Sequence, residues 1–143
     1  MAWHRPEFDN FKSSTMNPKG VNIYQSKYSV RETIDHLQQF LEAHGATIYA
    51  RIDQQDELRK TGQTIGALEF LMFGNPKAGG ALMAQTPLVA LDLPLKVIAW
   101  EDDNGKVWVA CNDAEYIEER YSLSHNENTP LNLDKLINAV LGN

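Results

Sequence analysis

Hydrophobic and polar residues follow two different periods along the chain, one typical of strands and one typical of helices. Residues 20–28 and 46–53 alternate with a period of two, which predicts two strands. Residues 66–74 are apolar on both faces except at Glu69 and predict a third strand. An Asn-Gly pair at 104–105 separates two apolar-rich segments within 95–111, a pattern typical of a β-hairpin. The sequence therefore predicts five strands.

The alternation also predicts which side chains share a face. In the second strand, three apolar side chains are expected on one face of the sheet: Ile48, Ala50 and Ile52. In the hairpin, a two-residue turn would set Trp100 opposite Val109, whereas a three-residue loop would set it opposite Trp108. The sequence leaves that register open.

Apolar residues three or four positions apart predict two amphipathic helices. The first runs from Ser29 to His44, and Ser29 with Glu32 forms a capping box at its start. The second covers 132–141, where five apolar residues form one stripe: Leu133, Leu136, Ile137, Val140 and Leu141. Shorter helical segments are expected at 54–62, 76–84 and 113–121. Two long helices can cover only one side of five strands, so the fold class is α+β, a two-layer sandwich with helices on one face of an antiparallel sheet.

Composition narrows the kind of protein. The 143 residues carry a formal net charge of -6, which opposes binding to nucleic acid or to an anionic membrane. The single cysteine, Cys111, cannot form an internal disulfide and is expected to be a buried, inert thiol. No apolar run reaches the length of a membrane helix and no signal peptide is visible, so a cytoplasmic location is expected.

The chain is expected to contain one domain, at 20–143, preceded by an extension at 1–19. The extension is polar, aperiodic and interrupted by two prolines. Its three aromatic residues are expected to dock on the domain or on a partner: Trp3, Phe8 and Phe11.

Four segments carry a resemblance to a known family: "ARID", "FGNPKAGGALM", "ALDLPLKVIAWED" and "ERYSL". In this order and spacing they resemble the bacterial and archaeal domain of unknown function family 302, over about Gly20 to Leu141. The resemblance implies a β-α-β(4)-α two-layer sandwich and a homodimer, and it implies no reaction, because the family has none established. The family usually has a histidine just after the aspartate of "RID"; Gln54 stands there in this chain, so a role that needs that imidazole is not carried over.

The segment "FGNPKAGGALM" is the main candidate site. Gly74 and Gly79 have the spacing with which a Walker loop begins, but the lysine and hydroxyl that such a loop needs do not follow. Asn75 and Pro76 predict the start of a helix, whose free backbone N–H groups can hold an anion. Gly80 would let a ligand approach the backbone, and Lys77 would add a positive charge. A simple strand-to-helix turn with glycines for tight packing is the competing interpretation.

"LDLPLK" is the second candidate. Asp92 lies among leucines and is expected to pair with Lys96, with Lys77 or with backbone N–H groups, most simply as a structural cap or ion pair. Asp53 and Glu69 would suit proton transfer or metal binding if they met, but we expect two solvated strand positions.

The remaining residues that carry chemistry predict no site. The four histidines have no metal-ligand spacing and are expected to be surface or capping residues: His4, His36, His44 and His125. Trp100 and Trp108 are expected to pack in the core or an interface, because the acidic hairpin around them opposes a polyanion.

Two functions remain. The favoured one is a non-catalytic homodimeric module that binds a small anionic or amphipathic ligand or a protein partner, without metal or cofactor. The alternative is a small enzyme that uses Lys77, Asp92 and the amides of the Gly74–Gly80 loop for acid–base chemistry. The first is favoured because no nucleophile–base pair, metal set or cofactor fingerprint is visible in the sequence. The homodimer is expected because the third to fifth strands are apolar on both faces.

Overall fold

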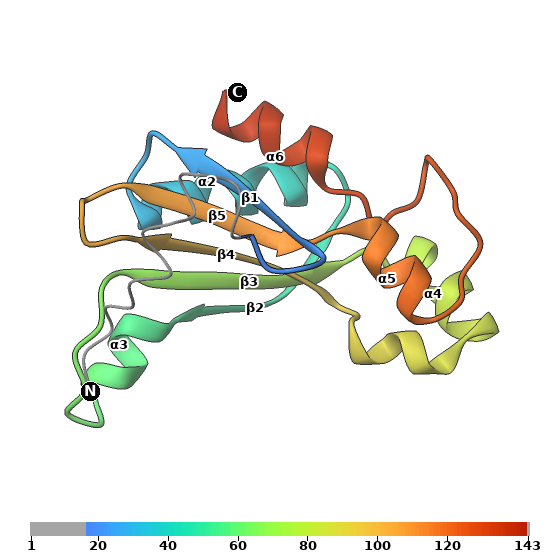
Figure 1. Cartoon of the computed structure of the whole chain (residues 1–143), viewed down its shortest axis with the longest axis horizontal. Coiled ribbons are helices and arrows are strands. Elements are labelled where there is room, and N and C mark those ends of the chain that lie inside the picture. Colours follow the sequence, from blue (N-terminus) through green and yellow to red (C-terminus); the bar gives the residue numbers. More distant parts are fainter. Residues whose placement is uncertain (1–16, 143) are drawn as a thin grey trace.

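The computed structural model of the chain describes residues 17–142. Its centre is one antiparallel sheet of five strands in the order β1-β5-β4-β3-β2 (Figure 1). The strands are β1 (Val21–Ser26), β2 (Thr47–Asp53), β3 (Leu68–Gly74), β4 (Leu95–Glu101) and β5 (Val107–Asn112). All five lie where the hydrophobic pattern predicts strands.

The two long helices pack on the same face of this sheet, which confirms the predicted two-layer α+β fold. They are α2 (Val30–Ala43) and α6 (Asp134–Leu141). The shorter helical elements are α3 (Gln54–Arg59), α4 (Pro76–Gln85), the 3₁₀ helix η2 (Pro87–Leu91) and α5 (Ala114–Arg120). Ser29 caps α2 as predicted, because its hydroxyl accepts a hydrogen bond from the backbone N–H of Glu32.

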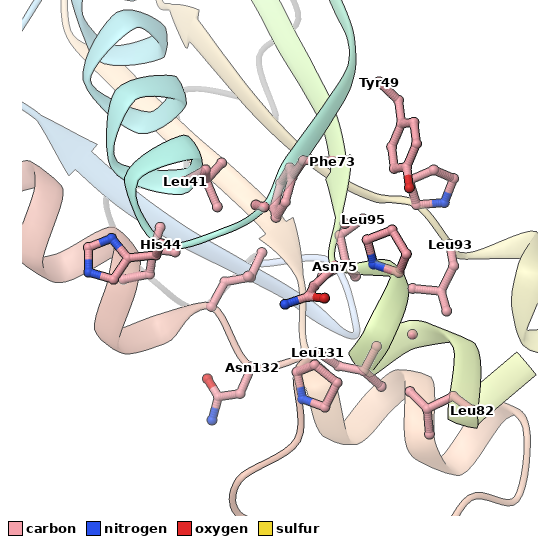
Figure 2. Close-up of a pocket in the computed structure, with 18 of the residues that line it drawn as sticks. Leu41, His44, Tyr49, Phe73, Asn75, Leu82, Leu93, Leu95, Leu131 and Asn132 are labelled. Atoms are coloured by element: carbon pink, nitrogen blue, oxygen red, sulfur yellow. The ribbon is translucent and has the colours of Figure 1, made fainter.

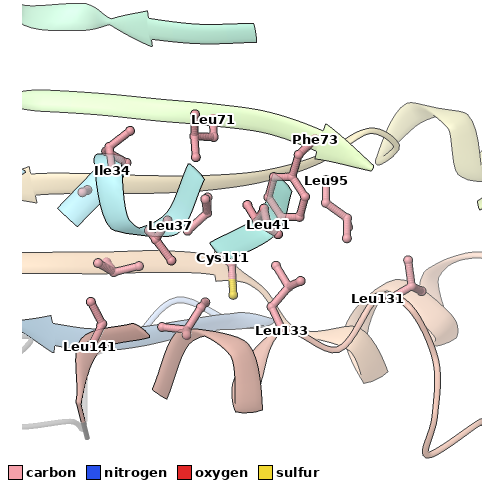
Figure 3. Packing of buried hydrophobic residues seen from close by; sticks show 14 of the residues in the cluster. Ile34, Leu37, Leu41, Leu71, Phe73, Leu95, Cys111, Leu131, Leu133 and Leu141 are labelled. Atoms are coloured by element: carbon pink, nitrogen blue, oxygen red, sulfur yellow. The ribbon is translucent and has the colours of Figure 1, made fainter. Parts of the chain in front are cut away.

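The main hydrophobic core lies between the sheet and these two helices (Figure 3). Ile34 and Leu37 of α2 are fully buried there, as are Leu71 and Val109 of the sheet and Ile137 of α6. Burying side chains of this size contributes roughly 1.5–3 kcal/mol each. The apolar stripes of the two helices therefore decide which face of the sheet they cover.

A β-bulge in β2 makes one prediction about side-chain facing wrong. Ile48 pairs with Phe73, which belongs to the main core, whereas Ala50 pairs with Met72 on the opposite face. Tyr49 is the extra residue between these two pairs. Since an added residue reverses the alternation beyond it, Ile48 and Ala50 lie on different faces.

The hairpin between β4 and β5 has the three-residue loop. Trp100 pairs with Trp108, and Gly105 adopts the left-handed conformation with φ of 79°. Asp102 holds the loop: one carboxylate oxygen accepts the backbone N–H groups of Asn104 and Lys106, and the other accepts the indole N–H of Trp108 at 2.8 Å.

The face of the sheet opposite α2 and α6 carries a second, smaller apolar cluster. Trp100, Trp108 and Ala110 are buried there, with Ile23 and Ile98 packed against them. The expected packing role of the two tryptophans is confirmed. The predicted docking of Trp3, Phe8 and Phe11 lies outside the described residues.

Candidate functional site

A cavity of about 300 Å³ opens where β3 runs into α4. Its walls come from the end of α2, the start of β2, the β3–α4 junction, the segment before β4 and the loop before α6 (Figure 2). The central lining residues are Leu41, Phe73, Asn75, Gly79, Leu82, Leu93, Leu95 and Leu131. The candidate loop of the sequence thus forms one wall of the cavity.

Local sequence explains the shape of that wall. β3 ends at Gly74, and Asn75 caps α4 by accepting the backbone N–H of Lys77 at 3.0 Å. Pro76 takes the first helical position, where its missing N–H has no consequence. Gly79 faces the cavity: a Cβ built there would lie 3.9 Å from the side chains of Leu93 and Met83. The predicted cap and the predicted helix are both confirmed.

Tyr49 and His44 line the cavity but carried no recognisable signal in the sequence. The bulge in β2 turns the ring of Tyr49 toward the cavity mouth, and a Cβ on Gly74 would lie 3.6 Å from that ring. Bulges often redirect a side chain beside a site. The bulge depends on how β2 pairs with β3, so the alternation of β2 alone does not reveal it.

Of the seven candidate residues in the sequence, three line the cavity: Gly74, Asn75 and Gly79. Gly80 faces open space, and Lys77 has an exposed side chain outside the lining. Lys96 lies on the other face of the sheet, with its ammonium 4.6 Å from the centre of the Phe70 ring. The structure therefore does not bring the two lysines together at the cavity.

Asp92 forms an ion pair, as expected, but with other partners. The guanidinium of Arg120 donates to its carboxylate at 3.2 Å, and the hydroxyl of Tyr121 donates to the same oxygen. This hydrogen bond raises the pKa of the Tyr121 hydroxyl. Both partners belong to α5 and its end, so Asp92 joins the segment before β4 to α5 and does not pair with Lys77 or Lys96.

The expectation that Asp53 and Glu69 are both solvated is wrong for Glu69. The two residues are neighbours across β2 and β3, and Glu69 is buried. Arg51 donates to the Glu69 carboxylate at 3.2 Å and to Asp35 of α2 at 2.7 Å. Asp53 caps α3 by accepting the backbone N–H of Asp56 at 2.9 Å. A cross-strand cation, which the spacing of the two acids does not reveal, explains how Glu69 is buried.

Cys111 and His125 lie outside the cavity lining. Burial, with a smaller contribution from Asp113, raises the pKa of the Cys111 thiol to about 12, as expected for an inert cysteine. Nδ1 of His125 donates to the buried carboxylate of Glu118 at 3.1 Å, and this hydrogen bond raises the pKa of His125. Within residues 17–142 no group of three or more potential ligands is placed to hold a metal ion.

Comparison with known proteins identifies the family. Residues 22–140 match the family described as Domain of unknown function DUF302, and the chain belongs to it. The crystal structure of an uncharacterized conserved protein DUF302 from Bacillus stearothermophilus shares the fold, with a TM-score of 0.73 and 16% sequence identity. The similarity covers 87% of this chain and 98% of that one.

The chain is also similar to part of two curated proteins. These are Fluoride-specific ion channel FluC 1 from Brucella suis biovar 1 (strain 1330) and from Brucella abortus biovar 1 (strain 9-941). Each is 35% identical over 104 residues, which cover 73% of this chain but only 41% and 38% of the two relatives. The chain thus spans about two fifths of their length. Among the residues that the structure describes, no helix is long and apolar enough to cross a membrane.

Proposed function

We propose that this protein is a non-catalytic module that binds a small, largely apolar ligand in the cavity beside α4. One observation carries the proposal: among residues 17–142, the cavity is lined mainly by leucine, phenylalanine, proline and glycine, with four polar residues (His44, Tyr49, Asn75 and Asn132) and no aspartate, glutamate, lysine or arginine. A concave, mainly apolar site with a few polar groups is the usual form of a small-molecule site. Its volume of about 300 Å³ lies at the lower end of the range for such sites.

The lining favours the amphipathic ligand over the anionic one. Lys77, the cation that the anion hypothesis required, does not line the cavity. A charged ligand would lose water of hydration there without gaining a counter-charge. The ligand expected from this lining is therefore apolar over most of its surface.

The arrangement of the side chains supports binding over catalysis. The alternative enzyme needed Lys77 and Asp92 together at the loop, whereas the Asp92 carboxylate is held by Arg120 and Tyr121. The thiol of Cys111 is buried on β5 and its pKa is high. Neither Asp92 nor Cys111 lines the cavity. Acid–base and nucleophilic chemistry at this site therefore gain no support.

The relatives support the idea of a module. In the two Brucella proteins, the region that matches this chain is a minor part of a longer protein named as a fluoride channel. The named activity is a property of those whole proteins. A domain that is also found within a longer protein is consistent with a binding role that serves another activity.

Two neighbouring glycines give a matched test. Gly79→Leu places a large side chain in the cavity, whereas Gly80→Leu places the same side chain in open space. Both changes replace a helix-weakening glycine and should stabilise α4 similarly. We expect the uncharged fluorescent probe N-phenyl-1-naphthylamine to bind wild type and Gly80→Leu alike, and Gly79→Leu at least tenfold more weakly, because the added side chain occupies the ligand volume.

The measurement is a fluorescence titration of the three proteins, with circular dichroism to show that each is folded. Equal binding by the two leucine variants would place the probe elsewhere and contradict the proposal. Absence of probe binding to the wild type would contradict it as well.

A further inference from the structure

We infer that the ligand of this cavity is uncharged and carries a hydrogen-bond acceptor, which is recognised by the side-chain amide of Asn75. The inference rests on the proposed binding function and names the chemical class that the same site selects. It follows from the orientation of one amide, the charges of the lining and the directions of the other polar side chains.

The cap at the start of α4 fixes the orientation of the Asn75 amide. Its Oδ1 lies 3.0 Å from the backbone nitrogen of Lys77. Because a backbone N–H can only donate, the atom facing it must be the amide oxygen and not the nitrogen. The Nδ2 group, with two N–H donors, is therefore on the other side of the amide.

That donor faces the cavity. Figure 2 shows the nitrogen of Asn75 on the side of the amide toward Leu41, which also lines the cavity, and the oxygen on the opposite side. Within residues 17–142, the hydrogen bond of the Asn75 side chain is the one that its Oδ1 accepts, and the residue is exposed, so that water can reach Nδ2. A ligand that displaces this water and offers no acceptor leaves the donor unpaired, so a ligand with an acceptor is favoured over one without.

Two other polar residues of the lining, His44 and Asn132, do not compete for this role. Nδ1 of His44 lies 2.8 Å from the carbonyl oxygen of Phe40, and the imidazole stacks on the Phe40 ring at 4.1 Å. Asn132 accepts the backbone N–H of Asp134 at 3.0 Å. Figure 2 shows both side chains directed away from Asn75. Tyr49 is 53% exposed and lies at the mouth.

The charges of the lining exclude a carboxylate or an ammonium group as the recognised feature. A carboxylate would accept from Asn75 but, among residues 17–142, would find no lysine or arginine in the lining to balance its charge. A ketone, ester, aldehyde or amide carbonyl accepts the same hydrogen bond without that requirement. The class that fits is a small, neutral, mainly apolar molecule with a carbonyl or ether oxygen.

Substitutions of Asn75 can remove its N–H donors while keeping an oxygen that caps α4. Serine and aspartate both keep an oxygen that caps α4, but neither keeps the N–H donors. Aspartate has no donor, and the one O–H donor of serine is on a shorter side chain that does not reach the position of Nδ2. Asn75→Asp also keeps the shape of the side chain. Equal melting temperatures for the wild type and the two variants would show that the cap is intact, so that a change in binding reports the lost donor.

Three probes that share one ring system test the ligand class: naphthalene, 2-acetylnaphthalene and 2-naphthoate. Calorimetric titration should show that the ratio of affinities for 2-acetylnaphthalene and naphthalene falls by about three- to tenfold in Asn75→Ser and Asn75→Asp, the range expected for one neutral hydrogen bond. Comparing ratios between proteins cancels the different solubilities of the probes. For the wild type, 2-naphthoate should be the weakest of the three.

An unchanged ratio in both variants, with naphthalene still bound and still excluded by Gly79→Leu, would overturn the role of Asn75 and leave the proposed function standing. Tightest binding of 2-naphthoate by the wild type would overturn the neutral ligand class. Failure of all three probes to bind would contradict the proposed function itself.

Discussion

Glu118 is a buried carboxylate that fixes the start of the loop leading to the cavity. Its two oxygens accept one bond each, from the imidazole of His125 and from the backbone N–H of Asn126, both at 3.1 Å. The same loop continues to residues 130–133, which line the cavity. The pair of Glu118 and His125 therefore connects a titrating imidazole to the loop that forms one wall of the cavity.

This pair predicts how stability changes with pH. The hydrogen bond to Glu118 and its charge raise the pKa of His125 above its ordinary value of 6.5. A group whose pKa is higher in the folded state stabilises fully below the unfolded pKa, and the contribution is lost as the pH rises through the folded pKa. From pH 6 to pH 8.5, wild type should therefore lose more free energy of unfolding than His125→Gln. Urea denaturation of both proteins at the two pH values measures the difference, and parallel pH dependence would contradict the prediction.

Single residues show where the sequence was informative about the site. Gly74, Asn75 and Gly79 were identified because glycines and a cap followed by proline have backbone meanings that do not depend on the rest of the fold. Lys96 is predicted as a site residue because it is charged and close to Asp92 in the sequence. Adjacent strand residues point to opposite faces, however, and Lys96 lies on the other face of the sheet from Leu95, which lines the cavity. The partners of Asp92 lie 28 and 29 residues away, and no local pattern indicates them.

At the scale of elements, α4 differs from the two long helices, α2 and α6. It contains no buried residue, whereas α2 buries five. Two adjacent glycines in its interior lower its helical stability by about 1 kcal/mol each relative to alanine. The helix that forms one wall of the cavity is thus held mainly by its Asn75 cap and its contacts with η2.

We expect the amides of α4 to exchange with deuterium faster than those of α2 under native conditions. Local opening requires little loss of buried apolar surface at α4, and opening of α2 requires loss of the main core. Ligand binding in the cavity should slow exchange in α4 and leave α2 unchanged. Mass spectrometry of exchanged, digested protein provides the measurement, and equal protection of the two helices in the free protein would show that α4 is not an independent opening unit.

The elements themselves were predictable, because their hydrophobic periods are long enough to be unambiguous. The stripe of α2 and the alternation of the hairpin both correspond to the observed elements. β2 shows the limit: its composition predicts a strand, but the bulge at Tyr49 moves Ala50 to the other face from Ile48. A bulge is set by pairing with β3, so strand content is encoded locally while facing and register are encoded in the partner strand.

At the scale of the whole molecule, the structure changes the basis of the predicted homodimer. The prediction assumed that the apolar outer face of β3, β4 and β5 would be exposed. Among the described residues, no large hydrophobic side chain of these three strands is exposed. The exposed large hydrophobic residues are Tyr49, Met83, Leu88 and Leu91, of which three belong to α4 and η2. Figure 1 places these two helices at the end of the molecule opposite α3.

The homodimer stays a prediction, and its contact is now expected at η2. Leu88 and Leu91 are 69% and 73% exposed, a large apolar exposure for two leucines three residues apart, and exposed apolar groups of this kind commonly meet a second copy. Replacing both by aspartate would place charges in that contact, so Leu88→Asp with Leu91→Asp should be a monomer at concentrations where the wild type is a dimer. Light scattering after size-exclusion chromatography gives the masses.

Gln63→Asp, in the exposed turn after α3 at the other end of the molecule, adds one charge elsewhere and should leave the dimer intact. A wild-type mass of 16.1 kDa at high micromolar concentration would exclude the dimer. If the variant with both aspartates is still a dimer, the contact is not at η2, because two charges buried there without partners would strongly weaken the dimer.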